Sequence, residues 1–198
     1  YMGLGVSNSG RVGPGKDDTG TQVYSFNQVY ASAIFDSDGK ILYAYVDQLE
    51  VATPNYDGAS MPNLSGLPGQ PGYNLDKNHD GKVDGKTENT EESFLSEIAA
   101  WRTKRERGDE YRMNTGTWAS QMDKYQQVFV GKTVGEAEAW FQKYCSDVNG
   151  RALKPDSSDE QDKAKYDALT DTEKAMLADV TSSATMSLQD PHGDILSA

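Results

Sequence analysis

The sequence has little cysteine and little positive charge. Cys145 is the only cysteine among 198 residues, which excludes an internal disulfide and a metal site built from cysteines. Lys and Arg number 19 against 31 Asp and Glu, so the formal net charge is −12 at pH 7. Nucleic acids and anionic membranes bind basic patches, and this balance therefore argues against both as partners. We expect Cys145, which follows an aromatic helical stretch, to be a small buried hydrophobic residue.

Long hydrophobic runs are also missing. No apolar stretch approaches the roughly 18–20 residues that a membrane-spanning helix needs. No signal peptide is visible, and the chain opens with Tyr1 rather than Met. We therefore expect an extracellular or cell-surface protein whose N-terminal segment has been removed, with any membrane anchor outside this chain.

The order of the predicted elements is a strand pair followed by several helices. Residues 23–35 and 41–51 are rich in β-branched and aromatic residues, and the turn sequence Asp-Ser-Asp-Gly-Lys at 36–40 joins them into a hairpin. The Gly- and Ser-rich residues 1–20 are predicted to be irregular. This order predicts an α+β fold, an antiparallel sheet with packed helices, in a single domain of residues 1–198.

Long insertions interrupt this pattern at about residues 52–115. Pro and Gly crowd residues 52–73, and loops of this length in compact domains are often functional. Residues 91–105 have the periodicity of one amphipathic helix.

The second half of the chain reads as helical, with local signals for helix starts. Residues 118–128 form one candidate helix, and a polar surface loop or helix start is expected at 154–162. A Thr followed three residues later by Glu forms a capping box, and this pattern occurs at Thr133/Glu136 and Thr170/Glu173. A short last helix is predicted to begin at Asp190-Pro191, and the C-terminal segment is a candidate for one further strand.

Residues 76–87 have oxygen-bearing side chains at alternating positions. They resemble the beginning of an EF-hand calcium loop, with Gly81 at the sharp turn and Thr87 in place of the last carboxylate. The predicted Ca²⁺ ligands are Asp76, Asn78, Asp80, the Lys82 carbonyl and Asp84. An Asp/Asn/Gly turn without metal is the alternative.

Residues 179–188 read Asp-Val-Thr-Ser-Ser-Ala-Thr-Met-Ser-Leu. This segment resembles the flavin-attachment sequence of the FMN-binding domain family, which includes flavin subunits of quinone reductases and extracellular electron-transfer lipoproteins. The matching residues are Asp179, Ser182, Ala184 and Thr185, while Ser183 stands where Gly is usual. The hairpin at 23–51 and the Gly-Lys-Thr sequence at 131–133 are similar to further elements of that family.

The resemblance implies that a flavin transferase links FMN to Thr185 through the phosphate, and that Asp179 helps the transferase recognise the chain. Small residues at 183 and 184 keep the approach to Thr185 open. The remaining candidate cofactor contacts are Met186, His192 for the phosphate or ring, and Met61 and Trp118 as walls for the ring. A polar turn between two helices is the alternative for this segment.

The function that follows is a secreted electron carrier without catalytic residues of its own. Its FMN would exchange electrons with a redox partner protein or a small acceptor. Two alternatives remain open: a calcium-stabilised extracellular binding module that has lost its flavin, and a reductase that binds FMN noncovalently.

Overall fold

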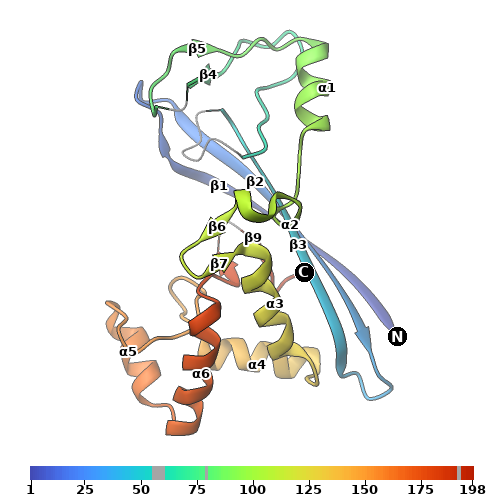
Figure 1. Ribbon diagram of the computed structural model, residues 1–198, viewed down its shortest axis with the longest axis vertical. Helices are drawn as coiled ribbons and strands as arrows, with labels where there is room; N and C mark the ends of the chain where they lie inside the picture. The colour runs from blue at the N-terminus through green and yellow to red at the C-terminus, as the bar shows by residue number, and fades with distance from the viewer. Residues whose placement is uncertain (55–60, 79, 191–192) are drawn as a thin grey trace.

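The computed structural model describes residues 1–54, 61–78, 80–190 and 193–198. Three long antiparallel strands form its main sheet, in the order β1-β2-β3 (Figure 1). They are β1 (Met2–Lys16), β2 (Gln22–Phe35) and β3 (Ile41–Ala52). The predicted hairpin is therefore confirmed as β2 and β3, and the α+β class is confirmed.

The expectation that residues 1–20 are irregular is wrong. β1 pairs with β2 along its length, from Met2 opposite Ile34 to Lys16 opposite Gln22, with one irregularity after Val12. Backbone N–H and C=O groups make such a ladder whatever the side chains are, so a Gly- and Ser-rich segment becomes a strand once a partner strand lies beside it.

Four helices pack below the sheet in the view of Figure 1. They are α3 (Trp118–Phe129), α4 (Val134–Tyr144), α5 (Glu160–Asp167) and α6 (Asp171–Ser183). Both predicted capping boxes are present, because Thr133 caps α4 with Glu136 and Thr170 caps α6 with Glu173. Asp159 caps α5 within the segment expected to start a helix.

The inserted region holds several short elements, grouped at the top of Figure 1 and leading down to the sheet. They are β4 (Asn74–Leu75), β5 (Gly85–Lys86), α1 (Glu91–Ala99), α2 (Lys104–Arg107), the 3-10 helix η1 (Gly108–Glu110), and the paired strands β6 (Arg112–Met113) and β7 (Gly116–Thr117). The single helix predicted at 91–105 is wrong. Thr103 has extended backbone and caps α2 in a capping box with Glu106, so a new helix starts there.

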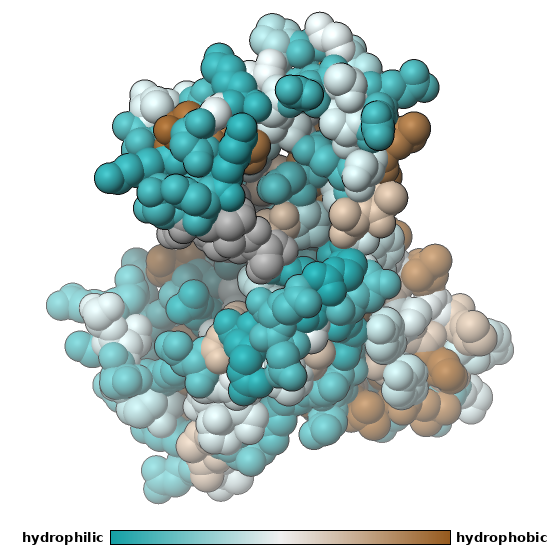
Figure 2. All heavy atoms as spheres, turned by 45° about the horizontal axis from the view of Figure 1, so that its top comes forward, coloured by the Kyte–Doolittle hydropathy of each residue, from teal (hydrophilic) through white to brown (hydrophobic). Residues whose placement is uncertain are grey.

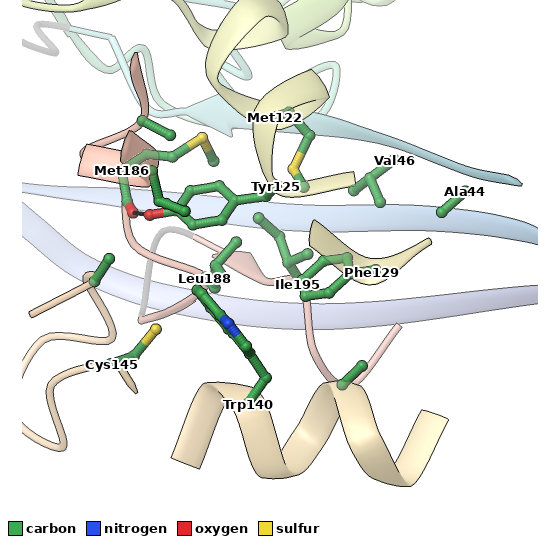
Figure 3. Packing of buried hydrophobic residues seen from close by; sticks show 14 of the residues in the cluster. Ala44, Val46, Met122, Tyr125, Phe129, Trp140, Cys145, Met186, Leu188 and Ile195 are labelled. Carbon is green, nitrogen blue, oxygen red and sulfur yellow. Dashed lines mark hydrogen bonds between the residues drawn. The ribbon is translucent and has the colours of Figure 1, made fainter. Parts of the chain in front are cut away.

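The hydrophobic core lies between one face of the sheet and the helices. Figure 3 shows Met122 and Phe129 of α3 on the side of Val46 of β3, while Tyr125 of α3 points toward Met186 and Trp140 of α4 lies near Leu188. Cys145 belongs to this core, as expected, and burial raises the pKa of its thiol to about 12, against a smaller lowering effect of Lys165.

The C-terminal segment completes the core. The short strands β8 (Gln189–Asp190) and β9 (Gly193–Asp194) pair with each other, and β9 packs against β1 and β2. The further strand is thus confirmed, whereas the helix predicted to begin at Asp190-Pro191 is wrong. Asp190 already belongs to a strand, and Pro191 lies outside the described residues.

Hydrophilic residues dominate the face shown in Figure 2, where hydrophobic residues form small separate groups. This agrees with the net charge of −12. Among the described residues, no helix combines the length and apolarity that crossing a membrane requires.

Candidate functional site

The segment that follows α6 has an alternating pattern of burial. Ala184, Met186 and Leu188 are buried in the core, while Thr185 and Ser187 between them are half-buried. Side chains of an extended segment point alternately to opposite sides. The three apolar residues therefore fix Thr185 and Ser187 on the side away from the core.

A buried glutamine holds this segment in place. Gln121 of α3 is fully buried, and its Oε1 accepts hydrogen bonds from the backbone N–H of Thr185 at 2.8 Å and of Met186 at 3.0 Å. The Tyr125 hydroxyl donates to the Met186 carbonyl at 3.1 Å, as the dashed line in Figure 3 marks. Helix α3 thus determines where the Thr185 side chain lies.

Thr185 lines a polar cleft of about 420 Å³, here called the Thr185 cleft. The side chains that give the cleft its chemistry are hydroxyls and cations, from Thr115, Arg151, Lys154, Ser157, Ser158 and Thr185, with Asp156 and Asp162 also in its lining. The hydroxyls of Thr115 and Thr185 lie 3.4 Å apart. The two cations and the two carboxylates balance in charge, and the hydroxyl and cationic groups are of the kind that contacts a phosphate ester.

The helix ends around Thr185 differ from expectation. The helix predicted to begin at Asp190-Pro191 is absent among the described residues, and the helix end nearest to Thr185 along the chain is the C-terminus of α6 at Ser183. A helix C-terminus carries partial negative charge and disfavours an anion. Helix α3 begins at Trp118, three residues after Thr115, and its N-terminal charge has the favourable sign. Arg151 and Lys154 supply the remaining positive charge.

The other residues of the attachment segment are on the surface of α6. Asp179 forms an ion pair with Lys124 of α3, with 2.7 Å between Nζ and Oδ2, yet its side chain stays 73% exposed. Ser182 and Ser183 are exposed, and Ser182 donates its hydroxyl hydrogen bond to the Asp179 carbonyl. A protein that approaches Thr185 would therefore reach Asp179 and both serines as well.

A second, smaller cavity of about 180 Å³ lies next to this segment and is here called the Lys104 cavity. Its aromatic and sulfur-containing walls and its cations come from Lys104, Tyr111, Met113, Trp118, Arg151 and Met186. Arg151 lines both cavities, and it pairs with Ser187 in an isolated β-bridge. Two of the predicted cofactor contacts, Trp118 and Met186, are therefore brought together, in a cavity that adjoins the Thr185 cleft.

Buried charges lie close to Lys104. Lys104 and Glu50 of β3 are 4% and 1% exposed, and 2.9 Å separates Nζ from Oε2. The Arg107 guanidinium is equally buried and stacks on the Tyr111 ring, 4.5 Å from its centroid. Burial lowers the pKa of Arg107, while Tyr111 and Glu50 act in the opposite direction. Glu50 thus pairs with Lys104 and also acts electrostatically on Arg107.

The remaining predicted flavin contacts are not brought to Thr185. Met61 is buried and accepts a hydrogen bond on sulfur from Arg107 at 3.0 Å. It lines a different cavity, together with Glu97 and Trp101, which no residue of 179–188 shares. The interpretation of Met61 as a wall for the ring is therefore not supported by its position. His192 lies outside the described residues.

The acidic loop joins β4 to β5 and is held by its own backbone. Asp76 accepts a hydrogen bond from the N–H of Gly81 at 2.7 Å, Asp80 from Lys82 at 2.9 Å, and Asp84 from Lys77 at 2.9 Å. Gly81 has a φ of +85°, which glycine adopts without strain. In the part of the chain that the structure describes, no three Asp, Glu, His or Cys side chains form a group able to hold a metal ion.

Sequence reasoning missed Gln121, Lys104 and Arg151. A usable signal existed for Gln121, because it is a polar residue on the face of α3 that also carries Trp118 and Tyr125. Lys104 and Arg151 come from separate segments, and only the fold brings them to one cavity.

Comparison with known proteins gives one informative relative. The chain is 34% identical over 212 residues to a protein of Desulfitobacterium hafniense named chlorophenol reductase. The alignment spans all of this chain and 55% of the relative, so the chain corresponds to about half the length of the curated protein that it matches. No family model matches the sequence, and no solved structure matches it. The relationship is thus to a protein named as a reductase.

Proposed function

We propose that this protein is a flavoprotein electron carrier that holds FMN through a phosphodiester bond to Thr185. The observation that carries the proposal is the position of the Thr185 hydroxyl. It lines a polar cleft beside Arg151 and Lys154, close in sequence to the exposed side chains of Asp179, Ser182 and Ser183. When bound there, FMN would supply reversible electron transfer, a chemistry that belongs to the cofactor and is tuned by the protein.

The residues of the cleft would hold the phosphate. Arg151 and Lys154 would neutralise its charge, and the hydroxyls of Thr115, Ser157 and Ser158 would donate hydrogen bonds. Gln121 would keep the attachment segment in one conformation, because it binds two successive backbone N–H groups. The cleft volume of about 420 Å³ falls within the range of small-molecule sites.

The relative named chlorophenol reductase supports a redox role in general terms. Electron transfer to a redox partner protein or a small acceptor, modification by a flavin transferase, and an extracellular or cell-surface location belong to the same proposal. The acidic composition and the exposed attachment surface support these parts. A reductase that binds FMN noncovalently is the competing form, since it would use the same cleft without a bond to Thr185.

The test is the intact mass of the chain after co-expression with a flavin transferase. We expect the parent to gain one FMN minus water, and Thr185→Ala to gain nothing. Ser183→Ala is the matched control, since it removes a neighbouring exposed hydroxyl and should leave the gain intact. Flavin that is lost on denaturation would favour noncovalent binding, and no flavin in any sample would exclude the carrier.

We retain calcium binding by the loop at 76–84 as part of the proposal, supported by its sequence pattern and by the turn at Gly81. The hydrogen bonds from backbone N–H groups to Asp76, Asp80 and Asp84 fit equally well a turn that needs no metal. Calorimetry of a calcium titration separates the two, because only a metal site would give a saturable heat that Asp80→Asn weakens.

A further inference from the structure

The buried side chain of Gln121 has partners at only one of its two polar atoms. Its Oε1 accepts hydrogen bonds from the backbone N–H groups of Thr185 and Met186. Within the part of the chain that the structure describes, its Nε2 has no hydrogen-bond partner, although the side chain is fully buried. Buried polar atoms of folded proteins are almost always paired. The unpaired amide nitrogen therefore points to an acceptor that the protein does not itself supply.

The hydrogen bonds of Gln121 establish which of its two amide atoms is the nitrogen. Rotation of a side-chain amide by 180° exchanges oxygen and nitrogen without changing the shape of the group. Both partners of the paired atom are backbone N–H donors, and only oxygen accepts from them. The unpaired atom is thus the nitrogen, and its N–H groups remain available as donors.

This nitrogen lies close to the Thr185 hydroxyl. Oγ1 of Thr185 is 3.5 Å from Oε1 of Gln121. In a planar amide with C=O and C–N bonds of about 1.23 and 1.33 Å, the nitrogen lies about 2.2 Å from the oxygen. Nε2 is therefore no more than about 6 Å from the Thr185 hydroxyl. A phosphate ester on that hydroxyl extends two bonds further, to oxygens that accept hydrogen bonds, and this reach can cover the distance to Nε2.

A neutral donor also suits the charges of the Thr185 cleft. Arg151 and Lys154 are balanced there by Asp156 and Asp162, so the cleft has no surplus positive charge of its own. A phosphodiester is an anion, and an N–H group that donates to an anion makes a stronger hydrogen bond than one between neutral groups. Gln121 supplies such a donor without adding a charge.

We propose that Gln121 binds the phosphate of the attached FMN, with Nε2 donating a hydrogen bond to a non-bridging oxygen of the phosphodiester on Thr185. Oε1 at the same time holds the backbone of Thr185 and Met186. This inference rests on the proposed flavin attachment and adds to it the residue that recognises the phosphate from the side of the core. The chain without FMN keeps an unpaired buried donor, and attachment provides its acceptor.

The first test uses ¹⁵N-labelled chain that was co-expressed with a flavin transferase and whose mass shows one FMN. We expect a side-chain amide proton of Gln121 to show a coupling to ³¹P across the hydrogen bond, and to exchange with solvent at least tenfold more slowly than in the chain without FMN. The side-chain amide of Gln126 is the internal control, because it already donates to Asp123 at 3.3 Å and should not change.

Two outcomes of this test would overturn the inference, and they are distinguishable. If the mass shows FMN on Thr185 but the Gln121 amide shows neither change, the attachment stands and the contact to the phosphate is wrong. If the mass shows no FMN, the proposed attachment and this inference fail together.

The second test is the rate of FMN attachment, followed by intact mass with purified transferase and FAD as the source of FMN. Gln121→Glu keeps an oxygen for the two backbone N–H groups, loses the donor and places a negative charge beside the phosphate, so the rate should fall at least tenfold. Gln127→Glu makes the same change at an exposed position of the same helix and should leave the rate unchanged. A parent-like rate in folded Gln121→Glu would contradict the inference, and if this variant does not fold, the amide signals of the parent decide.

Discussion

Buried and exposed polar side chains of this protein both accept hydrogen bonds from backbone N–H groups. Behind the Thr185 segment, the buried Gln121 accepts hydrogen bonds from two backbone N–H groups. In the loop between β4 and β5, exposed Asp80 and Asp84 also accept hydrogen bonds from backbone N–H groups. Water can replace the contacts of the loop but not those of Gln121. The same kind of contact should therefore contribute very differently to stability.

Breaking the buried ion pair should have the largest effect. In Lys104→Met, the carboxylate of Glu50 stays 1% exposed without its closest cation, and we expect a loss of about 3–5 kcal/mol in unfolding free energy. Urea unfolding measures this loss. Glu50→Gln/Lys104→Met should recover most of it. As a control, Arg112→Met breaks an ion pair whose side chains are both largely exposed and should cost less than about 1 kcal/mol. Similar losses of unfolding free energy in Lys104→Met and Arg112→Met would contradict the expected difference between buried and exposed polar contacts.

Removing the acceptor behind Thr185 should come next. Gln121→Leu keeps the apolar volume but leaves the N–H groups of Thr185 and Met186 without their partner, at an expected cost of about 2–4 kcal/mol. The exposed Gln127 on the same helix is the matched control, and Gln127→Leu should change stability by less than about 0.5 kcal/mol. Urea unfolding measures the stability of both variants. If Gln121→Leu were as stable as Gln127→Leu, Gln121 would not hold the segment in place.

Local features of this fold could be predicted from the sequence, whereas features that depend on distant residues could not. The hairpin of β2 and β3 and the capping boxes at Thr133 and Thr170 depend on residues close in sequence, and they were predicted correctly. β1 was missed because its pairing partner, not its composition, makes it a strand. The attachment segment was predicted as a motif, but the burial alternation that turns Thr185 outward appears only with the core in place.

The residues that line the cavities could not be predicted from the sequence. Lys104 reaches its cavity from α2, and Arg151 reaches it from the segment after α4. Lys104 becomes a neighbour of Arg151 only because α2 packs on β3 and Arg151 pairs with Ser187 of the Thr185 segment. Neither residue belongs to a local pattern that marks it as part of a site.

Several hydrogen-bond donors converge on the half-buried carboxylate of Glu173. The hydrogen bond from Lys143, and then the Thr170 backbone amide and the Tyr144 hydroxyl, lower the pKa of Glu173 from 4.5 to about 2. A lowered pKa stabilises the fold above the unfolded value and loses that contribution as pH falls through the folded value. Stability of the parent should therefore fall more steeply than that of Glu173→Gln between about pH 4.5 and 2.

Thermal unfolding at a series of pH values measures that difference. Glu138→Gln removes an exposed carboxylate of α4 and is the control, expected to follow the parent. If Glu173→Gln also followed the parent across this pH range, the capping box and its neighbours would not be acting on the carboxylate.

The smallest effect is expected in the acidic loop without metal. Asp80→Asn keeps an oxygen that can accept the Lys82 N–H, so the unfolding free energy in a chelator should change by less than about 0.5 kcal/mol. Calcium makes this small effect informative. If Ca²⁺ binds the loop, it raises the unfolding temperature of the parent with increasing concentration and does so less in Asp80→Asn, because only binding to the folded state shifts the equilibrium. If neither protein responds, the exposed carboxylates serve only to close the turn, and the contrast with Gln121 then rests on solvent exposure alone.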